Sequence, residues 1–578
     1  MSERRSRRRA VCLIALTGAL TGVLALGWLA VRVVQVRSHL LAARAGLSLA
    51  AGHLDATPPA LTHMSESVRR ELRAARAGVD DPIWRAAAAV PLAGRSFAAV
   101  RVATRVSSDL ADSATTPVLQ VLERIRDGGV LVAGRVDLAL VGDVSAQLQP
   151  VASNLHRGSQ RLSAVPRRWL PGPLAQDLNQ LDSRLAAADA GLQAANPGLK
   201  MAPSMLGAAG PRRYFLAVQN NAEVRGTGGL VGAYAVLRID RGSISLDAVG
   251  TDRDFRTGTV PLADLGPDYA ERYGNGGPTL WSSAGLSPDW PSAGTVMARL
   301  WEAQGGGHLD GVIGIDPRAI AGLLSVTGPV TVEGRRITSA NVADFVMRDE
   351  YVESNVPQAQ RKNVLADLAL ALYQRVVAGG YDTVAMGRAL GSAAAGGHLQ
   401  VMSTNPVEQA VLQPMRVSGA LPAAPGAFLD VVLNNAAGNK VDYYLRRKVS
   451  YVRTGSRAGR LTVTLTNTVD PRAVPPIVTG RLDEPAIPGD PGQTRLLLSL
   501  YVGVGDAVRS VTADGVALGA NLGSERGHGV ATVAVEVSPQ HPTVVTADVT
   551  DHGGELTYRQ QPLAVDDTLD LHVPFRLG

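Results

Sequence analysis

The sequence is poor in cysteine, lysine and aromatic residues, and each scarcity narrows what the protein can be. Cys12 is the single cysteine, which excludes an intrachain disulfide and a cysteine-based zinc site. Aromatic residues make up 4% of the 578 residues, and no basic run is interleaved with them, so nucleic-acid binding is not favoured. Part of the net charge of +6 comes from arginines within the first ten residues. The basic isoelectric point of about 9.5 therefore overstates any basic patch on the folded part.

Standard catalytic motifs are also absent. The sequence has no GxSxG, HExxH, Walker or CxxC motif, and its 10 histidines include no pair at i, i+4 spacing. A Ser/His/Asp triad assembled from distant residues has no sequence feature that supports it. The hydrophobic fraction of 46% and the mean hydropathy of +0.07 are typical of globular protein with a sizeable core, and not of a multi-span transporter or a disordered chain.

One long apolar run lies near the N-terminus. Residues 10–31 carry no charge, and at 1.5 Å per residue they can cross a hydrocarbon core of about 30 Å. Trp28 suits the membrane interface, and the arginines of residues 1–9 outnumber Arg32 and Arg37. We therefore predict a basic cytoplasmic tail (1–9), a single transmembrane helix (10–31) and an extracytoplasmic bulk at the cell membrane. The alternative is a cleaved signal peptide, but the run is long and no small-x-small site precedes Arg32.

The rest of the chain divides into three regions by its patterns. Residues 32–204 have apolar residues at i, i+3, i+4 spacing, which predicts a helical stalk or bundle, with a lipid-facing amphipathic surface as the alternative. Residues 205–425 alternate short strands with helices, which predicts a layered α/β or α+β head. Residues 426–578 contain seven short alternating strands separated by Gly/Pro/Asp-rich turns, which predicts an all-β sandwich.

The first polar cluster of the predicted head follows a strand directly, in the segment QNNAEVRGTGG. Glycines let backbone N–H groups approach a ligand, and an arginine can bind phosphate in bidentate fashion. A turn that satisfies its own hydrogen bonds explains the same pattern equally well. The candidate ligand-binding residues are Asn220, Asn221, Glu223, Arg225, Gly228 and Gly229.

The second cluster ends another predicted strand, where ligands of α/β sheets often bind. Its members are Asp252, Arg253, Asp254 and Arg256. An acid beside an arginine can hold a divalent cation and a phosphate together, so Asp252 and Asp254 are candidate Mg²⁺ ligands. A solvated charged loop is the competing interpretation.

The third and fourth clusters are Arg348 with Asp349, and Arg361 with Lys362. The latter pair starts a long predicted helix, and a helix N-terminus with two cations attracts anions. Each cluster alone is a weak signal. Together the four clusters predict a site for a polyanion, such as a pyrophosphate, with a metal ion.

Two passages resemble a known family. The segments YFLAVQNNAEVRGTGGLVGAYAVLRIDRGSI and LDGVIGIDPRAIAGLLSVTGPV resemble a bacterial envelope family known as domain of unknown function 4012. We expect the resemblance to extend to the N-terminal anchor and to NKVDYYLRRKVSYV. The family implies a place in the cell envelope but no established activity.

The order of elements more distantly resembles the LytR-CpsA-Psr phosphotransferases, which move glycopolymers from polyprenyl-pyrophosphate carriers onto peptidoglycan. AVGTDRDF is similar to their strand-end Arg-Asp motif, which would give Arg253 and Asp254 catalytic roles. FVMRDEYVE and AQRKNVLADL are similar to their arginine-bearing turn and helix start, which would place Arg348 and Arg361 on the pyrophosphate. The sequence departs from that pattern: no proline precedes Arg253, Asp349 adjoins Arg348, and Lys362 replaces a glutamine.

Two hypotheses follow. In the first, the protein is a glycopolymer phosphotransferase that binds a polyprenyl-pyrophosphate-linked glycan and a cell-wall polymer, with Mg²⁺ neutralising the leaving pyrophosphate. In the second, it is a non-catalytic envelope scaffold, or a glycan- or lipid-binding protein. The two differ in whether Arg225, Arg253, Arg348 and Arg361 converge on one pocket.

Overall fold

A computed structural model describes the backbone of residues 2–53, 57–256, 258, 260–274, 280–352, 358–483 and 490–578. Side chains are described over the same ranges except for residues 2–23, 51, 58, 127, 128, 263 and 358–363. The chain forms two compact units. The helical unit comprises Met1–Gly128 and Ala139–Lys200, and the body comprises Gly129–Leu138 and Met201–Gly578.

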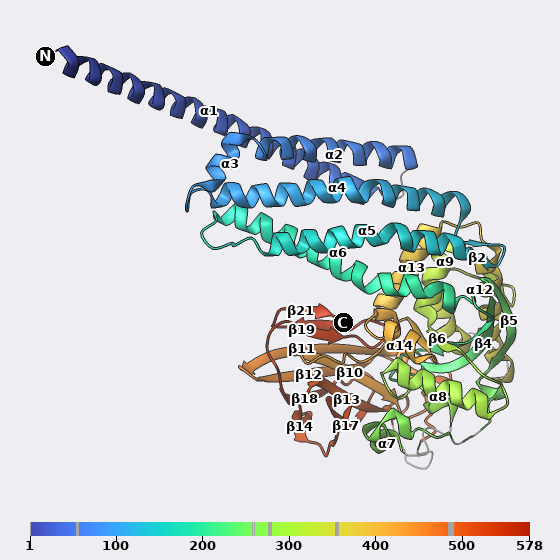
Figure 1. Ribbon diagram of the computed structural model, residues 1–578. Coiled ribbons are helices and arrows are strands. Elements are labelled where there is room, and N and C mark those ends of the chain that lie inside the picture. Colours follow the sequence, from blue (N-terminus) through green and yellow to red (C-terminus); the bar gives the residue numbers. More distant parts are fainter. Residues whose placement is uncertain are drawn as a thin grey trace. The chain divides into compact units, whose positions relative to one another are not determined.

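The helical unit is built on one long N-terminal helix (Figure 1). Helix α1 (Ser2–Gly52) packs along α2 (Pro58–Val79), with Val36 and Ala43 buried between them. The unit continues with α3 (Pro82–Ala89), α4 (Arg95–Gly128), α5 (Leu138–Ser163) and α6 (Gly172–Met205). Ala99, Leu162 and Leu178 join α4, α5 and α6 in one apolar cluster.

Helix α1 is long and apolar enough to cross a membrane. Among the residues with described side chains, the stretch that meets this criterion by length and composition is Leu24–Ala50. Its second half is packed against α2 through Val36 and Ala43. The part of α1 that precedes these contacts includes most of the predicted span at 10–31, whereas Trp28 bonds to Asp81 and Leu29 packs with the Val36 cluster.

The body begins with a mixed seven-stranded sheet of order β1-β2-β5-β4-β3-β6-β9. Its long strands are β3 (Arg212–Asn220), β4 (Leu230–Asp240) and β5 (Ser243–Thr251), each antiparallel to its sequence neighbour. Strand β6 (Gly311–Ile315) pairs parallel to β3, and β9 (Leu399–Ser403) closes the edge antiparallel to β6. The hairpin β1 (Leu131–Val132) and β2 (Arg135–Val136) extends the other edge, so the expected all-helical region 32–204 is interrupted by two strands of the head.

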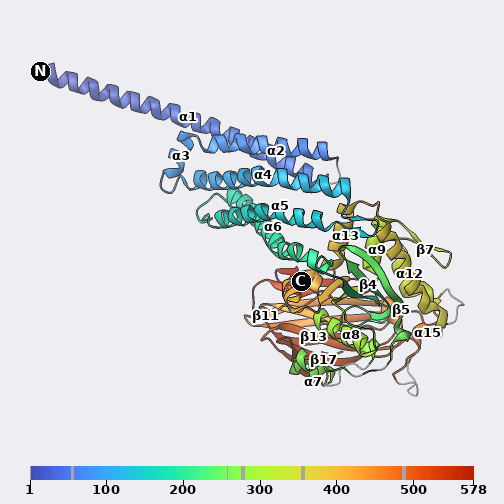
Figure 2. The ribbon, with the colours of Figure 1, turned by 45° about the vertical axis from the view of Figure 1, so that its right-hand side comes forward.

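Helices cover both faces of this sheet (Figure 2). On one face, Phe215 and Ala217 of β3 pack with α8 (Trp290–Ala303) and with Trp281 in an aromatic-rich core. On the other face, Val218 packs with α9 (Pro317–Thr327) and α12 (Gln358–Ala378). Alternate residues of one strand thus serve two cores, which is the pattern of a sheet buried on both sides.

The connections of the head are short elements. They are η1 (Asp252–Asp254), η2 (Ala263–Leu265), α7 (Pro267–Tyr273), η3 (Trp281–Ser283), β7 (Val330–Val332), β8 (Arg335–Ile337), α10 (Val342–Asp344), the π-helix η4 (Phe345–Asp349), α11 (Glu350–Val352), α13 (Thr383–Ala395), α14 (Pro406–Leu412) and η5 (Arg416–Ser418).

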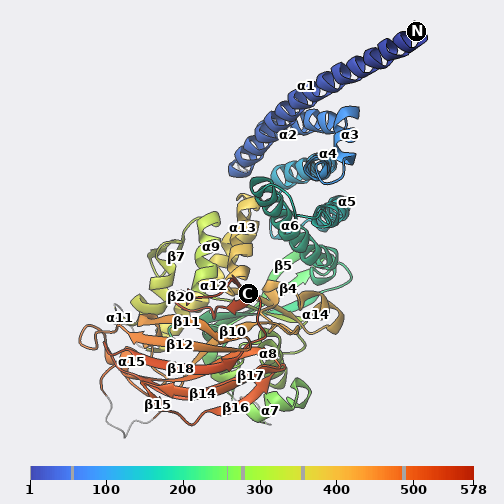
Figure 3. The ribbon, with the colours of Figure 1, turned by 90° about the vertical axis from the view of Figure 1, so that its left-hand side faces the viewer.

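The C-terminal region forms two six-stranded sheets that share one apolar core (Figure 3). One sheet has the order β16-β17-β13-β10-β19-β21 and the other β15-β14-β18-β12-β11-β20. The strands are β10 (Phe428–Asn435), β11 (Leu445–Gly455), β12 (Ala458–Asn467), β13 (Thr494–Val504), β14 (Val508–Ala513), β15 (Val516–Ala517), β16 (Asn521–Glu525), β17 (His528–Val537), β18 (Thr543–Thr550), β19 (Leu556–Arg559), β20 (Thr568–Leu571) and β21 (Phe575–Leu577), with η6 (Val441–Tyr444) and α15 (Pro476–Thr479) between them.

The head and the C-terminal sheets pack tightly within the body. Val224, from the turn after β3, belongs to the core of the C-terminal sheets. In the reverse direction, the backbone oxygen of Pro562 accepts a 2.9 Å hydrogen bond from the Asn221 amide of the head. The join between the two sheet systems is therefore an interior of the protein.

Candidate functional site

The turn after β3 lies inside this join. Arg225 is 8% exposed, and its guanidinium donates to three backbone oxygens: Ser282 at 2.7 Å, Val224 at 2.9 Å and Asn435 at 3.4 Å. Burial lowers the pKa of Arg225, which nearby Glu223 and another carboxylate partly oppose. The Arg225 guanidinium thus links backbone oxygens of the head (Ser282 and Val224) to one of the C-terminal sheets (Asn435). We call this role an internal brace, because it stabilises the join from inside.

The other polar residues of this turn also bond within the protein. Asn220 donates to the Tyr351 hydroxyl at 2.8 Å, and Glu223 forms a partly buried ion pair with Lys440. A Cβ at Gly229 would overlap the backbone of Asn220, so the glycine permits a close chain contact and not an open ligand cradle. The self-bonded turn is the interpretation that this geometry favours.

The predicted strand-end cluster forms η1, a single turn after β5. Asp254 accepts a 2.8 Å hydrogen bond from the Thr251 amide. Burial raises the pKa of Tyr234, and the Asp254 carboxylate that accepts its hydrogen bond raises it further. Arg253 is exposed beside it, while Phe255 packs into the aromatic core against Trp281 at 3.8 Å between ring centroids.

The Arg348 cluster lies in the π-helix η4 and also pairs locally. Arg348 donates to Asp349 at 2.7 Å and to the Tyr443 hydroxyl at 3.3 Å, and Asp344 lies 3.6 Å away. The carboxylate of Asp349 raises the pKa of Arg348. The side chains of Arg361 and Lys362 lie outside the described residues, although their backbone starts α12 as the sequence predicts.

The described contacts do not bring Arg225 and Arg348 together. Arg225 and Arg348 share no hydrogen-bond or ion-pair partner in the described contacts, and neither they nor Arg253 line a described cavity. Within the described part of the chain, no group of three or more His, Cys, Asp or Glu side chains is placed to hold a metal ion. Mg²⁺ at Asp252 and Asp254 stays a prediction.

The body also contains a cavity, and its lining residues include none of the described arginines of the predicted clusters. A cleft of about 870 Å³ lies at the join, between α13, α14 and the loop after η5 on the head side and β10 and the β19 end on the other. Its walls are mostly apolar, with Met415, Leu421, Phe428 and Pro562 among them. Cavities of this size, with few polar groups on apolar walls, are typical ligand sites.

A buried histidine–aspartate pair borders this cleft. His398 is 9% exposed, and its Nδ1 lies 2.6 Å from Oδ2 of Asp316, which is 2% exposed. Oδ1 of Asp316 accepts from the amides of Arg318 and Ala319, at 2.9 and 3.0 Å, as the N-cap of α9. A carboxylate that already accepts these bonds is an acceptor for Nδ1–H, so the neutral imidazole carries its lone pair on Nε2.

Asn221, a residue predicted from the sequence, supports the same pair from behind the residues that line the cleft. Its amide donates to Oδ2 of Asp316 at 3.3 Å as well as to Pro562. Nε2 of His398 has no hydrogen-bond partner among the described residues, and His398 lines the cleft. The imidazole is thus held in one orientation and is able to accept a proton from a bound molecule.

Cationic groups complete the cleft. Arg318, Arg416 and Arg559 line it, whereas Asp566 is the one acidic side chain among the residues that line it. Arg318 pairs with Asp566, and this hydrogen bond lowers the pKa of Asp566. The Gln400 side chain, 2% exposed, also lines the cleft, and its Oε1 has no partner in the described structure. Arg559 pairs with Asp430 at 3.4 Å and donates to the backbone oxygens of Pro288 at 2.7 Å and Gly419 at 2.9 Å, and Arg416 donates to the backbone oxygen of Leu577. All three arginines of the cleft thus have partners within the protein, and its apolar walls are the feature that most resembles a ligand site.

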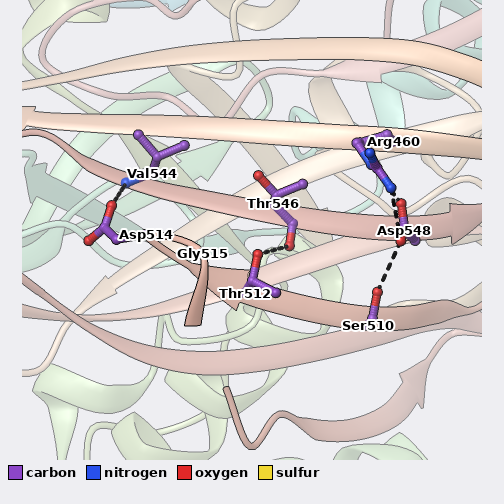
Figure 4. Close-up of a pocket in the computed structure, with 8 residues that line it drawn as sticks. All are labelled: Arg460, Ser510, Thr512, Asp514, Gly515, Val544, Thr546 and Asp548. Atoms are coloured by element: carbon purple, nitrogen blue, oxygen red, sulfur yellow. Dashed lines mark hydrogen bonds and ion pairs between the residues drawn. The ribbon is translucent and has the colours of Figure 1, made fainter. Parts of the chain in front are cut away.

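A second, shallower hollow lies on the outer sheet of the C-terminal region (Figure 4). Its volume is about 470 Å³, and it is lined by short polar side chains of β14 and β18 with Arg460 of β12. Arg460 bonds Asp548 at 2.8 Å, and Asp548 also accepts from Ser510 at 3.3 Å. These side chains satisfy one another on an exposed sheet face, which does not distinguish a ligand site from ordinary surface.

Sequence reasoning missed the His398 pair because its members are far apart. Asp316 precedes a proline at a helix start in GVIGIDPRAI, which is a readable N-cap signal. His398 is a single histidine in AAAGGHLQV, 82 positions away. Nothing in the sequence pairs them, because the contact depends on β9 lying beside β6.

The fold and the cleft together define a chain with an apolar N-terminal helix, a helical unit, and a head joined to two C-terminal sheets around a cationic cleft. Residues 209–351 match the family model described as Protein of unknown function (DUF4012). The resemblance to this family predicted from the sequence is confirmed over that range, which includes Asn221, Arg225 and Asp316. No curated protein and no solved structure matches the chain.

Proposed function

We propose that this chain is a membrane-anchored, extracytoplasmic envelope protein whose body binds a polyprenyl-pyrophosphate-linked glycan in the His398 cleft. One observation carries the proposal: the cleft combines apolar walls, suited to a prenyl chain, with Arg318, Arg416 and Arg559, which would exchange their acceptors in the protein for phosphate oxygens when a ligand binds. The C-terminal sheets, which we interpret as a sandwich, form one wall. The apolar stretch of α1 supports the anchor, with the arginines of residues 1–9 on the cytoplasmic side.

Ligand-dependent stabilisation of the full chain in nanodiscs tests this proposal. A ligand that binds only the folded state stabilises it by RT ln(1 + [L]/Kd), or about 2.7 kcal/mol at 100 Kd. Geranyl pyrophosphate is the probe, with and without Mg²⁺, and inorganic pyrophosphate and geraniol are the separate halves. We expect geranyl pyrophosphate to raise the melting temperature more than either half.

Four matched variants locate the site. Arg318→Ala opens a partly exposed ion pair in the cleft, so it weakens binding without unfolding the body. Arg253→Ala and Arg348→Ala remove the arginines predicted from sequence, and Arg238→Ala removes an exposed strand arginine as a control. Loss of the shift in Arg318→Ala alone supports the cleft. Loss in Arg253→Ala and Arg348→Ala would instead support a phosphotransferase-like site at those clusters.

Transfer chemistry is the second candidate, and the Asp316–His398 pair favours it. Nε2 of His398 would take the proton of an acceptor hydroxyl from a cell-wall polymer. The hydroxyl oxygen would bond to the glycan-bearing phosphorus, the bond to the second phosphate would break, and prenyl phosphate would leave. A transfer assay with His398→Ala and Asp316→Asn tests this step. Binding retained with transfer lost supports it, whereas unchanged transfer in both variants contradicts it.

A further inference from the structure

Two exposed loop tips lie at the same end of the helical unit. The first is the Val90–Gly94 turn between α3 and α4, and the second is the turn between α5 and α6 that carries Trp169. Leu92 is 70% exposed and Trp169 is 72% exposed, which places both among the four most exposed large apolar side chains of the described residues. Both also have positive φ angles, 65° and 73°, which bulky residues rarely adopt.

This end of the unit is the end at which α1 leaves it (Figures 1 and 3). Trp28 of α1 donates to Asp81 at 3.1 Å, and Asp81 is the N-cap of α3. Trp84 of α3 donates to the backbone of Phe97 at the start of α4. The cluster of Ala99, Leu162 and Leu178, joined by Val165 and Leu170, then fixes the second turn against the first turns of α4.

The uncharged stretch of α1 directly precedes Trp28. From residue 10 to residue 27 no charge occurs, and 18 residues of helix span about 27 Å, close to a hydrocarbon core. If α1 crosses a bilayer there, Trp28 lies at its surface, and the loop end of the unit lies level with it. The inference therefore rests on the proposed anchor.

Charge at this end points to the same occupant. Arg85, Arg95 and Arg168 are exposed, and no acidic partner is described for any of the three. Asp80, Asp81 and Asp182 at this end are already bonded to arginines. Exposed apolar tips flanked by unpaired arginines are the composition of a surface that binds anionic lipid interfaces.

Two arginine–tryptophan pairs also lie at this end of the helical unit. The Arg32 guanidinium lies 4.6 Å from the Trp28 ring centroid, and that of Arg168 lies 5.1 Å from the Trp169 ring centroid. Amphipathic tryptophans with adjacent cations are characteristic of the headgroup layer. We propose that the Leu92 and Trp169 tips dip into the headgroup layer of the bilayer that α1 crosses, so that the helical unit stands on an anionic membrane surface.

Site-directed spin labelling of the full chain in nanodiscs with phosphatidylglycerol tests this contact. Native Cys12 is labelled as the anchor control, and Ala93→Cys and Ala164→Cys, each in a Cys12→Ser background, place labels beside the intact tips. His53→Cys, just past the end of α1 and exposed, is the water control. Accessibility to oxygen reports lipid, and accessibility to a nickel chelate reports water.

We expect the labels at 93 and 164 to have oxygen-to-nickel accessibility ratios between those at 12 and 53. A further variant, Leu92→Ser with Trp169→Ser, is expected to return the label at 93 to the value at 53. Labels at 93 and 164 that match residue 53 while residue 12 is in lipid would overturn the proposal. A water-exposed residue 12 would instead refute the anchor itself, so the two failures are distinguishable.

Discussion

Replacing Arg225 with methionine separates an internal brace from a ligand-binding arginine. The side chain makes two good hydrogen bonds, 2.7 Å to Ser282 and 2.9 Å to Val224, and a longer one of 3.4 Å to Asn435. A hydrogen bond that involves a charged group contributes about 1.5–3 kcal/mol, so the two short bonds contribute about 3–6 kcal/mol. Removing a buried charge returns part of its desolvation cost, and methionine keeps most of the packing. We expect a net loss of about 2–4 kcal/mol from the body.

Hydrogen exchange of the full chain in nanodiscs measures this loss where it occurs. The amides of β10 and β13 lie in the centre of one C-terminal sheet, so their slowest exchange reports the opening free energy of the body. Arg238→Met, at an exposed position of β4, is the matched control and should change that free energy by less than about 0.5 kcal/mol. An Arg225→Met protein as stable as the Arg238→Met protein would refute the brace.

Three further stability predictions follow from the body. Gly229→Ala should destabilise it because the new Cβ meets backbone, whereas Gly387→Ala, at an open position in α13, should stabilise it by about 0.5–1 kcal/mol in the same melting assay. Burial raises the pKa of Asp442 to about 7, so the folded body binds its proton more tightly than the unfolded chain. The free energy of unfolding should fall as pH rises from about 4 to 7, and Asp442→Asn should make it less dependent on pH in that range. An unchanged pH dependence in Asp442→Asn would contradict the raised pKa of Asp442. Arg447 and Asp567 form a fully buried bidentate pair at 2.6 and 2.9 Å, so Arg447→Met should cost about 3–5 kcal/mol in urea unfolding, and adding Asp567→Leu should recover most of it. Equal stability of the single and double variants would argue against the pair.

Alternation and turn residues made much of the fold readable from sequence. The sequence predicts head strands at 214–221, 231–240, 243–251 and 311–316, and β3, β4, β5 and β6 lie there. Of the seven predicted C-terminal strands, the one at 507–516 folds instead into the β14–β15 hairpin, and β10, β16, β19 and β21 lie outside all seven. One difference is local: residues 441–444 of the predicted strand KVDYYLRRKVSYVRT form a 3₁₀ turn before β11. β10 escaped prediction because all eight of its residues are buried, so FLDVVLNN has no polar–apolar alternation.

The site was less predictable than the fold. Arginines next to glycines and acids suggest a phosphate site, yet Arg225 and Arg348 bond within the protein. The same residue types serve a buried brace and a ligand cradle, and only burial distinguishes them. The cleft, by contrast, is lined by residues of the 390s, the 410s and the chain's last twenty positions, whose proximity depends on tertiary contacts that no local pattern records.

Photocrosslinking shows whether a prenyl-pyrophosphate ligand occupies the His398 cleft. The full chain in nanodiscs is irradiated with a benzophenone-bearing prenyl pyrophosphate, digested with trypsin and mapped by mass spectrometry. Cleavage after arginine and lysine gives peptides 389–416 and 417–440 from the cleft, and peptide 349–361 from the clusters predicted from sequence. We predict label on 389–416 and 417–440 that excess unlabelled geranyl pyrophosphate competes away and that Arg318→Ala reduces. Competed label on 349–361, with the cleft peptides unlabelled, would contradict the account.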